Sequence, residues 1–174
     1  MRADDTGFRE LVEEHQSMVF SIALRILGDR GAAEEVAQDA FVTLYGTLEQ
    51  LESKEHVRFW LRRVAVHRST DYLRRRLLRP EFAAQEWTEQ HEGSPDERFG
   101  QNSAVGTRLE QMLLSLPEGL RVAVVLRYQE DMAPDEIAKL LGQPLATVKS
   151  NLQRGLELLR RKAGVMLKEF VRER

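Results

Sequence analysis

Apolar residues recur at steps of three and four along most of the chain, which is the spacing of one face of an α-helix. Near the N-terminus, such a stripe runs from Phe8 to Leu27 and stops at the turn-forming residues 28–31. A second stripe runs from Ala33 to Leu48 and opens with Glu34 and Glu35, whose charge suits the first turn of a helix. The pattern predicts two long amphipathic helices joined by a tight turn.

A third helix is predicted from about Val57 to Arg76, and Pro80 ends the first unit. Its apolar positions include Phe59, Trp60 and Leu61. The opposite face of this helix is strongly basic. It carries Arg62, Arg63, Arg68, Arg74 and Arg75.

Residues 81–107 lose the periodicity, are polar and acidic, and contain Gly93-Ser94-Pro95. A connection of this length and composition is typical of a flexible linker. No strand pattern stands out anywhere. We therefore expect an all-α protein of two small helical domains, 1–80 and 108–174, joined by the flexible linker 81–107. Within the second domain, helices are predicted at about 109–116, 120–128, 135–141 and 146–171.

Charge is segregated along the chain, although 26 basic and 28 acidic residues leave a net charge of only −2. Residues 1–53 hold 4 basic and 11 acidic side chains, whereas residues 54–80 hold 9 and 2. Residues 137–174 hold 9 and 3. Two basic segments in an acidic chain permit two local contacts with an anionic polymer. The alternative is that both are solvated helix faces.

Several function classes lack the residues that they need. The chain has no cysteine, which excludes disulfides, thiol catalysis and cysteine-ligated metals. No nucleophile–base pair or Gly-rich phosphate loop is present, so we expect no enzyme and no cofactor. No secretion signal or membrane-length apolar run is visible, which indicates a soluble cytoplasmic protein without membrane insertion. The four histidines are scattered, and we interpret each as a polar surface or boundary residue rather than a metal ligand. They are His15, His56, His67 and His91.

The segment from Pro134 to Arg161 has the layout of a helix-turn-helix, with Gly142 allowing the turn. Val148 and Leu152 would hold the second helix against the first. The remaining positions near the start of that helix face outward, and their side chains can contact base edges or phosphates. They are Thr147, Lys149, Ser150, Gln153 and Arg154. An ordinary helix pair with a Gly turn is the alternative.

Residues 54–80 offer a second nucleic-acid site, because cations interleaved with aromatic rings suit a single strand. Cations follow the strand's backbone while rings stack on its bases. The alternative is that Phe59 and Trp60 are core residues and the arginines are solvated. The rings of this segment are His56, Phe59, Trp60, His67 and Tyr72.

Three strings resemble the sigma-70 family of bacterial transcription initiation factors, most closely its small extracytoplasmic-function group. FRELVEEHQSMVFSIALRILGDRGAAEEVAQDAFVTLY (Phe8 to Tyr45) is similar to the first two helices of sigma region two. FWLRRVAVHRSTDYLRRR (Phe59 to Arg76) is similar to the promoter-melting helix. SLPEGLRVAVVLRYQEDMAPDEIAKLLGQPLATVKSNLQRGLELLRRK (Ser115 to Lys162) is similar to sigma region four.

The resemblance implies binding to core RNA polymerase, recognition of a melted −10 element and of a duplex −35 element, and control by an anti-sigma factor. It implies a cytoplasmic protein that associates with the nucleoid when active. It implies that the outward stripe of the helix-turn-helix contacts the −35 element. It implies that the loop from Ser53 to Val57 helps to contact the −10 element. The residues implied for polymerase binding are Val36, Gln38, Asp39 and Phe41, and those for the −10 element are Trp60, Arg63, His67 and Arg68.

Two positions depart from the family pattern. His67 stands where relatives often carry Asn, which makes the −10 preference uncertain. Asn151 stands where relatives usually carry Arg, which we expect to remove a phosphate contact. Two other functions stay open on the sequence alone. One is a stand-alone helix-turn-helix regulator, and the other is an all-helical protein that binds polymerase or a regulator without reading promoters.

Overall fold

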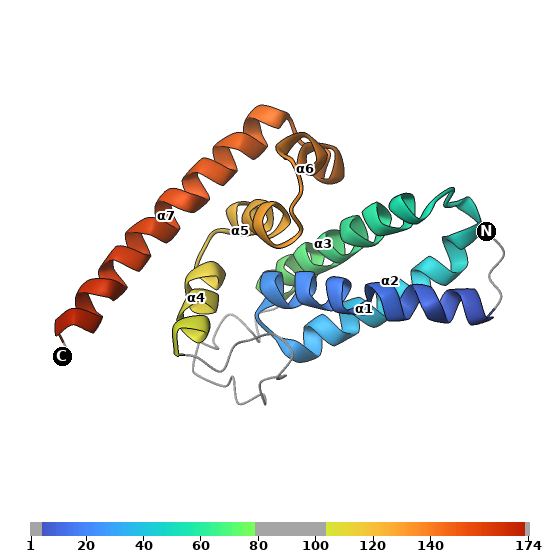
Figure 1. The fold of residues 1–174 in the computed structure, drawn as a ribbon, viewed down its shortest axis with the longest axis horizontal. Coiled ribbons are helices and arrows are strands. Elements are labelled where there is room, and N and C mark those ends of the chain that lie inside the picture. The colour runs from blue at the N-terminus through green and yellow to red at the C-terminus, as the bar shows by residue number, and fades with distance from the viewer. Residues whose placement is uncertain (1–4, 79–103, 173–174) are drawn as a thin grey trace. The chain divides into compact units, whose positions relative to one another are not determined.

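The computed structural model describes residues 5–78 and 104–172, and all regular structure within these two ranges is helical (Figure 1). The predicted all-α class is therefore confirmed. The chain divides into two compact units, Met1–Gly93 and Ser94–Arg174. Most of the expected linker, together with His91, lies outside the described residues.

Three long helices form the first unit, and each packs against the other two. All three were predicted, and α3 begins earlier than the expected Val57. The elements are α1 (Asp5–Leu27), α2 (Arg30–Thr47), the short 3₁₀ helix η1 (Leu48–Gln50) and α3 (Lys54–Leu78).

The turn between α1 and α2 follows from two adjacent residues. Gly28 adopts a φ of +68°, in the left-handed region that glycine tolerates, and its N–H donates to the carbonyl of Leu24 at 2.8 Å. Asp29 then caps α2, because its carboxylate accepts from the N–H of Ala32 at 3.0 Å. The chain thus reverses within a few residues, as predicted.

His15 is buried in this unit, contrary to the expected surface or boundary position. It is only 4% exposed, and it shares the inward stripe of α1 with Leu11 and Val19. The helical period therefore overrides the polarity of the side chain. Fully buried aliphatic side chains make up the surrounding core. They include Val19, Ile22, Ile26, Leu44, Leu48, Val57 and Leu61.

In the second unit the helices α4, α5 and α6 all pack against α7. The first of them begins at Ala104, within the range 81–107 that was expected to be linker. The buried core includes Leu116, Leu126, Ile137, Leu140 and Val148. The elements are α4 (Ala104–Leu114), α5 (Glu118–Val124), the π-helical turn η3 (Val125–Gln129), α6 (Pro134–Leu141) and α7 (Leu145–Arg172).

The helix expected over 120–128 is not uniform, because it widens into η3. A π turn adds a residue per turn and changes the phase of the side chains. In the π turn, Tyr128 is 59% exposed, while Met132 beyond it is buried. Arg127 closes the following bend by donating to the carbonyl of Met132 at 3.1 Å.

Arg121 is a buried cation with a structural task. Its Nη2 donates to the carbonyls of Leu114 and Leu116, at 2.6 and 3.0 Å, and so fixes the turn between α4 and α5. Burial lowers the pKa of this guanidinium, and Glu118 opposes that shift. In the part of the chain that is described, none of the helices has the length and apolar character to cross a membrane.

Candidate nucleic-acid interface

The helix-turn-helix is built by short-range signals at both of its ends. Pro134 occupies the first turn of α6, where a missing N–H has no cost, and the Glu136 carboxylate accepts from the N–H of Ala133 at 2.7 Å. Gly142 ends α6 with a φ of +62°. The carbonyl of Pro144 then accepts from the N–H of Thr147 at 3.0 Å and starts α7.

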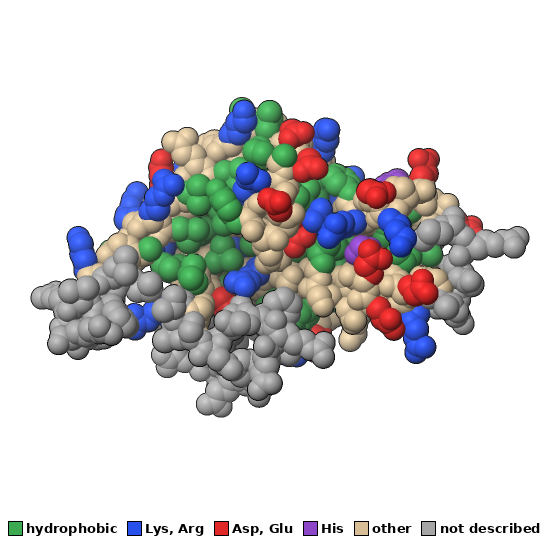
Figure 2. All heavy atoms as spheres, viewed as in Figure 1, with side chains coloured by type: hydrophobic (Ala, Val, Ile, Leu, Met, Phe, Trp, Pro, Cys, Tyr) green, Lys and Arg blue, Asp and Glu red, His purple; other side chains and the backbone are tan. Residues whose placement is uncertain are grey.

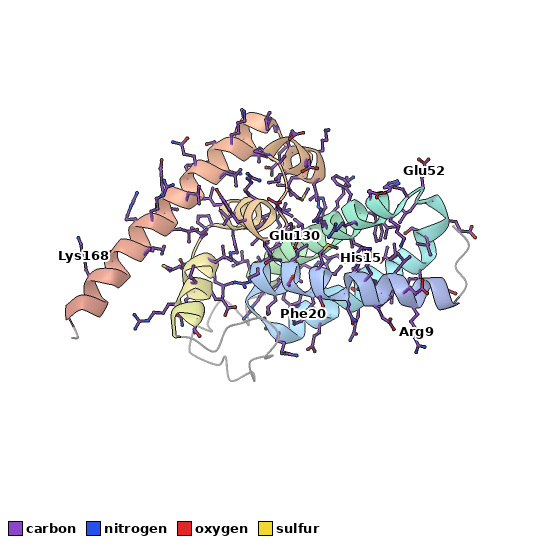
Figure 3. The ribbon with its side chains drawn as sticks, viewed as in Figure 1. Arg9, His15, Phe20, Glu52, Glu130 and Lys168 are labelled. Atoms are coloured by element: carbon purple, nitrogen blue, oxygen red, sulfur yellow. The ribbon has the colours of Figure 1, made fainter. Side chains whose placement is uncertain are left out.

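All five predicted −35 residues are exposed on α7, whereas Val148 is fully buried and Leu152 is 9% exposed. The buried pair fixes the rotation of α7 and turns the exposed residues outward as one stripe. Figure 2 shows Lys and Arg side chains exposed along α7, and Figure 3 shows Lys168 pointing away from it. The stripe consists of Thr147, Lys149, Ser150, Gln153 and Arg154.

Two members of the stripe are oriented by neighbours on the same helix. Gln153 Nε2 donates to Glu157 Oε1 at 3.1 Å, and Arg154 Nη2 donates to Asn151 Oδ1 at 3.2 Å. Both are local bonds over three or four residues. Each helps to hold a long side chain whose donors can reach base edges or phosphates.

Asn151, the position where relatives usually carry Arg, does not face outward in this chain. It is 9% exposed, and its amide nitrogen lies 3.8 Å from the position that a Cβ on Gly119 would take. This side chain therefore faces the start of α5 and supports Arg154.

Gly155 positions α7 and was missed by sequence reasoning. A Cβ at this position would lie 2.9 Å from Val124 Cγ2, so α7 packs closely on α5 and a larger residue would force the Val124 side chain to move. The sequence signal was a lone glycine inside a long predicted helix. Glycine lowers helix stability at such a position, so its presence indicates close packing there.

On α3, three of the predicted −10 residues follow one helical stripe at steps of three and four. Trp60 is partly buried, while Arg63 and His67 are exposed. The loop expected from Ser53 to Val57 is instead mostly the first turn of α3. Ser53 Oγ accepts from the N–H of His56 at 3.1 Å and caps this helix, which explains the earlier start.

Arg68, the fourth predicted −10 residue, is engaged within the protein. Its Nη1 donates to Asp39 Oδ2 at 3.1 Å, and its Nη2 donates to Thr43 Oγ1 at 2.7 Å. The Thr43 hydroxyl in turn donates to the backbone carbonyl of Asp39 at 2.8 Å. These bonds join α3 to α2 and bring a predicted −10 residue together with a predicted polymerase-binding residue.

The predicted polymerase-binding residues on α2 lie in different environments. Gln38 and Asp39 are exposed and Phe41 is partly buried, but Val36 is 4% exposed and packs with Ala33 in the core. The side chain of Val36 therefore supports the helix from inside.

Sequence reasoning missed two apolar side chains on the same helix, Val42 and Tyr45, which are 73% and 53% exposed. Tyr45 packs edge-on against Phe8, with ring centroids 5.0 Å apart. The sequence did contain a signal, because both apolar residues lie off the stripe of α2 that is predicted to be buried. Large apolar groups left in water often mark a contact surface.

His15, labelled in Figure 3, is a buried titratable group of α1. Burial lowers the pKa of its imidazole below the usual 6.5, Glu14 opposes that shift, and Arg58 of α3 adds to it. Its Nε2 has no hydrogen-bond partner among the described residues. No group of three His, Asp or Glu side chains in 5–78 and 104–172 is arranged to hold a metal ion.

Comparison with known protein families finds two matches, in chain order. Residues 11–78 match the model of sigma-70 region 2, and residues 107–159 match a model of sigma-70 region 4. The first match covers α2, α3 and most of α1, and the second covers α6 and the first part of α7.

Full-length similarity is found with several sigma factors. The chain is 34% identical over 153 residues to the RNA polymerase sigma-E factor of Streptomyces coelicolor, covering 88% of this chain and 84% of the relative. It is 27% identical over 169 residues to the extracytoplasmic-function sigma factor SigW of Bacillus subtilis, with coverages of 92% and 90%.

Two solved structures share the fold. The sigma factor RpoE of Bartonella quintana, solved with the anti-sigma factor NepR, has a TM-score of 0.71 at 17% identity and covers 91% of this chain and 98% of its own. CnrH, solved with the cytosolic domain of CnrY, has a TM-score of 0.65 at 24% identity, with coverages of 94% and 91%.

Proposed function

This chain belongs to the extracytoplasmic-function group of the sigma-70 family, and from that membership we propose how its two units divide promoter recognition. As a sigma factor it binds core RNA polymerase and promoter DNA and directs transcription initiation, and it is not an enzyme. The likeness to region 2 removes the stand-alone regulator as an alternative, because such a regulator has no use for a polymerase-binding unit.

In our proposal the second domain, 108–174 within the second unit, reads the −35 element as duplex, and the linker between the domains is the part of 81–107 that precedes α4. The observation that carries this assignment is the outward stripe of α7, which joins five exposed polar side chains to a rigid helix-turn-helix. The N-terminal end of α7 would enter the major groove. There Lys149 and Arg154 would donate to guanine or phosphate, and Gln153 would pair with adenine.

The first unit, 1–80, would bind polymerase and open the −10 element. Trp60, Arg63 and His67 lie on one stripe of α3, where a ring can stack on an unpaired base and the Arg63 cation can follow the strand. On α2 we assign the polymerase contact to Gln38 and Asp39 together with the exposed Val42 and Tyr45.

We also propose an anti-sigma partner and association with the nucleoid during activity. Support for the partner comes from the two solved relatives, one in complex with an anti-sigma factor and the other with the cytosolic domain of CnrY. The exposed apolar pair on α2, Val42 and Tyr45, offers such a partner a surface. Sigma factors act on DNA in the cytoplasm, where both contacts are available.

Transcription from a randomised promoter library tests the function. Core polymerase with the chain should enrich transcripts that share two motifs at a fixed separation, whereas core polymerase alone should not. Substituting Gln153 or Lys149 should change only the upstream motif, and substituting His67 only the downstream one. Absence of enrichment would reject the function, and changes in the opposite motifs would reject the division between the units.

A further inference from the structure

One polar cluster joins the two faces that the proposed function assigns to different partners. Asp39 lies on the polymerase-binding face of α2, and Arg68 is a predicted −10 residue of α3. The Arg68 guanidinium donates to the Asp39 carboxylate at 3.1 Å and to the Thr43 hydroxyl at 2.7 Å. The same ion pair therefore includes a side chain from each face.

The hydrogen bonds of this cluster are complementary. The Thr43 hydroxyl gives its single proton to the Asp39 carbonyl at 2.8 Å, so its lone pairs stay available to accept from Arg68. Asp39 and Thr43 lie one helical turn apart on α2, where they offer two acceptors to one guanidinium. Arg68 is thus held in a defined position while its partners stay bound to it.

The cluster is also easy to open. The side chains of Arg68 and Asp39 are 38% and 58% exposed, and ion pairs this exposed contribute little to stability because water competes for both charges. A cationic partner surface can bind the Asp39 carboxylate in place of Arg68. A DNA phosphate or base edge can bind the Arg68 guanidinium in place of Asp39. Neither competitor has to unfold the helices.

We propose that Asp39 and Thr43 hold Arg68 in a closed position, so that polymerase at Asp39 and a DNA strand at Arg68 each compete with the same internal ion pair. This inference rests on the function proposed above. Binding of either partner releases the side chain that the other needs. Since linkage between two binding sites is reciprocal, each partner then strengthens the binding of the other by the same factor.

The competing explanation is a structural tie, in which the ion pair only keeps α2 packed on α3. The two explanations predict effects of opposite sign. We call the proposed role a latch, meaning an ion pair that either partner opens. If the pair is a latch, removing Asp39 frees Arg68 and raises affinity for DNA, and removing Arg68 frees Asp39 and raises affinity for polymerase. If it is a tie, each change loosens the unit and lowers both affinities.

The experiment measures binding of the full chain to a fluorescent random-sequence DNA single strand and, separately, to core polymerase. Asp39→Ala should bind the strand about two- to five-fold more tightly, the factor that corresponds to an exposed ion pair of about 0.5–1 kcal/mol. Thr43→Val should act in the same direction without any change of charge. Arg68→Gln should raise affinity for polymerase by a similar factor.

Glu34→Ala is the matched control, because Glu34 is an exposed acid on the same helix that pairs with Arg30 at 3.0 Å within α2. It removes the same charge as Asp39→Ala without touching α3. Adding Arg68→Gln to Asp39→Ala should cancel the gain in DNA affinity. Thermal unfolding of each variant confirms that it is folded.

Affinities that fall, or an Asp39→Ala gain no larger than that of Glu34→Ala, would overturn the latch while wild-type initiation leaves the proposed function standing. A wild-type chain that binds no polymerase would instead reject the proposed function, and the latch with it.

Discussion

The two basic helices support their charged side chains in different ways. On α7, Arg154 and Gln153 bond to Asn151 and Glu157 of the same helix, and buried Val148 and Leu152 fix the helix as a whole. On α3, Arg68 bonds across to α2. The proposed −35 stripe is therefore supported within a single helix. The proposed −10 surface is instead bonded to a second helix, to which we assign another partner.

The largest effect that separates the units should come from the helix-turn-helix core. Ile137 is fully buried, and Ile137→Ala should destabilise the second unit by about 2–5 kcal/mol through lost burial and a cavity. Native-state hydrogen exchange should show lost protection in α6 and α7 with protection kept in α1–α3. Ile22→Ala, at a fully buried site of α1, is the mirror experiment. Equal loss in both units would show that the units are not independent.

A smaller effect should show that α7 residues act singly. Gln153→Ala and Lys149→Ala should each relax preference at one −35 base pair, at a cost of about 1–3 kcal/mol for a good base contact. Competition binding to a panel of −35 variants measures this. Arg160→Ala, which removes an exposed cation farther along α7, is the control and should weaken all variants alike. An unaltered base preference in both variants would reject the assignment of the stripe to −35 recognition.

Helix capping should give a weaker effect, confined to the first unit. Asp29 accepts from the N–H of Ala32, and Asp29→Ala should cost about 1 kcal/mol. Urea unfolding followed by far-UV circular dichroism measures the loss. Asp29→Asn, which keeps an accepting oxygen, should restore most of it, and a full loss in both variants would argue that the cap is not the cause.

The pH dependence of stability should show the smallest effect, also confined to the first unit. Because the pKa of His15 is lowered on folding, its contribution is fully present above about pH 6.5 and is lost as pH falls toward the folded pKa. This slope cannot exceed about 1.4 kcal/mol per pH unit, the value for one proton. His15→Leu should flatten the curve below about pH 6.5, measured by urea unfolding, relative to the wild type. A curve equally steep in the variant would assign the slope to other groups.

Much of the fold could be predicted because local rules agree with the tertiary structure. Gly28 and Asp29 mark a helix end and a helix start, and Pro134 and Gly142 mark the two ends of α6, so periodicity and turn chemistry locate the same boundaries. The prediction failed where the polarity of a side chain was given more weight than its position on the helical stripe. His15 follows its helical stripe into the core although its side chain is polar.

The candidate site was predicted in part, for a similar reason. The exposed stripe of α7 follows from helical periodicity alone, and the structure places all five of its residues outward. Asn151 could not be placed from the sequence, because its inward position depends on the close approach of α5 to α7. The pairing of Arg68 with Asp39 depends on how α3 crosses α2, which no spacing within one helix reveals.

The alternation along α7 has a consequence for how such proteins diversify. Positions 148, 151, 152 and 155 are buried and maintain the fold, whereas 147, 149, 150, 153 and 154 are exposed. Selection for stability and selection for a promoter sequence therefore act on interleaved but separate sets of positions. After gene duplication, a copy can acquire a new −35 preference by surface substitutions and keep its scaffold. Arg68 lacks this freedom under the proposed function, because a substitution that alters the DNA contact proposed for it also alters its bonds to α2.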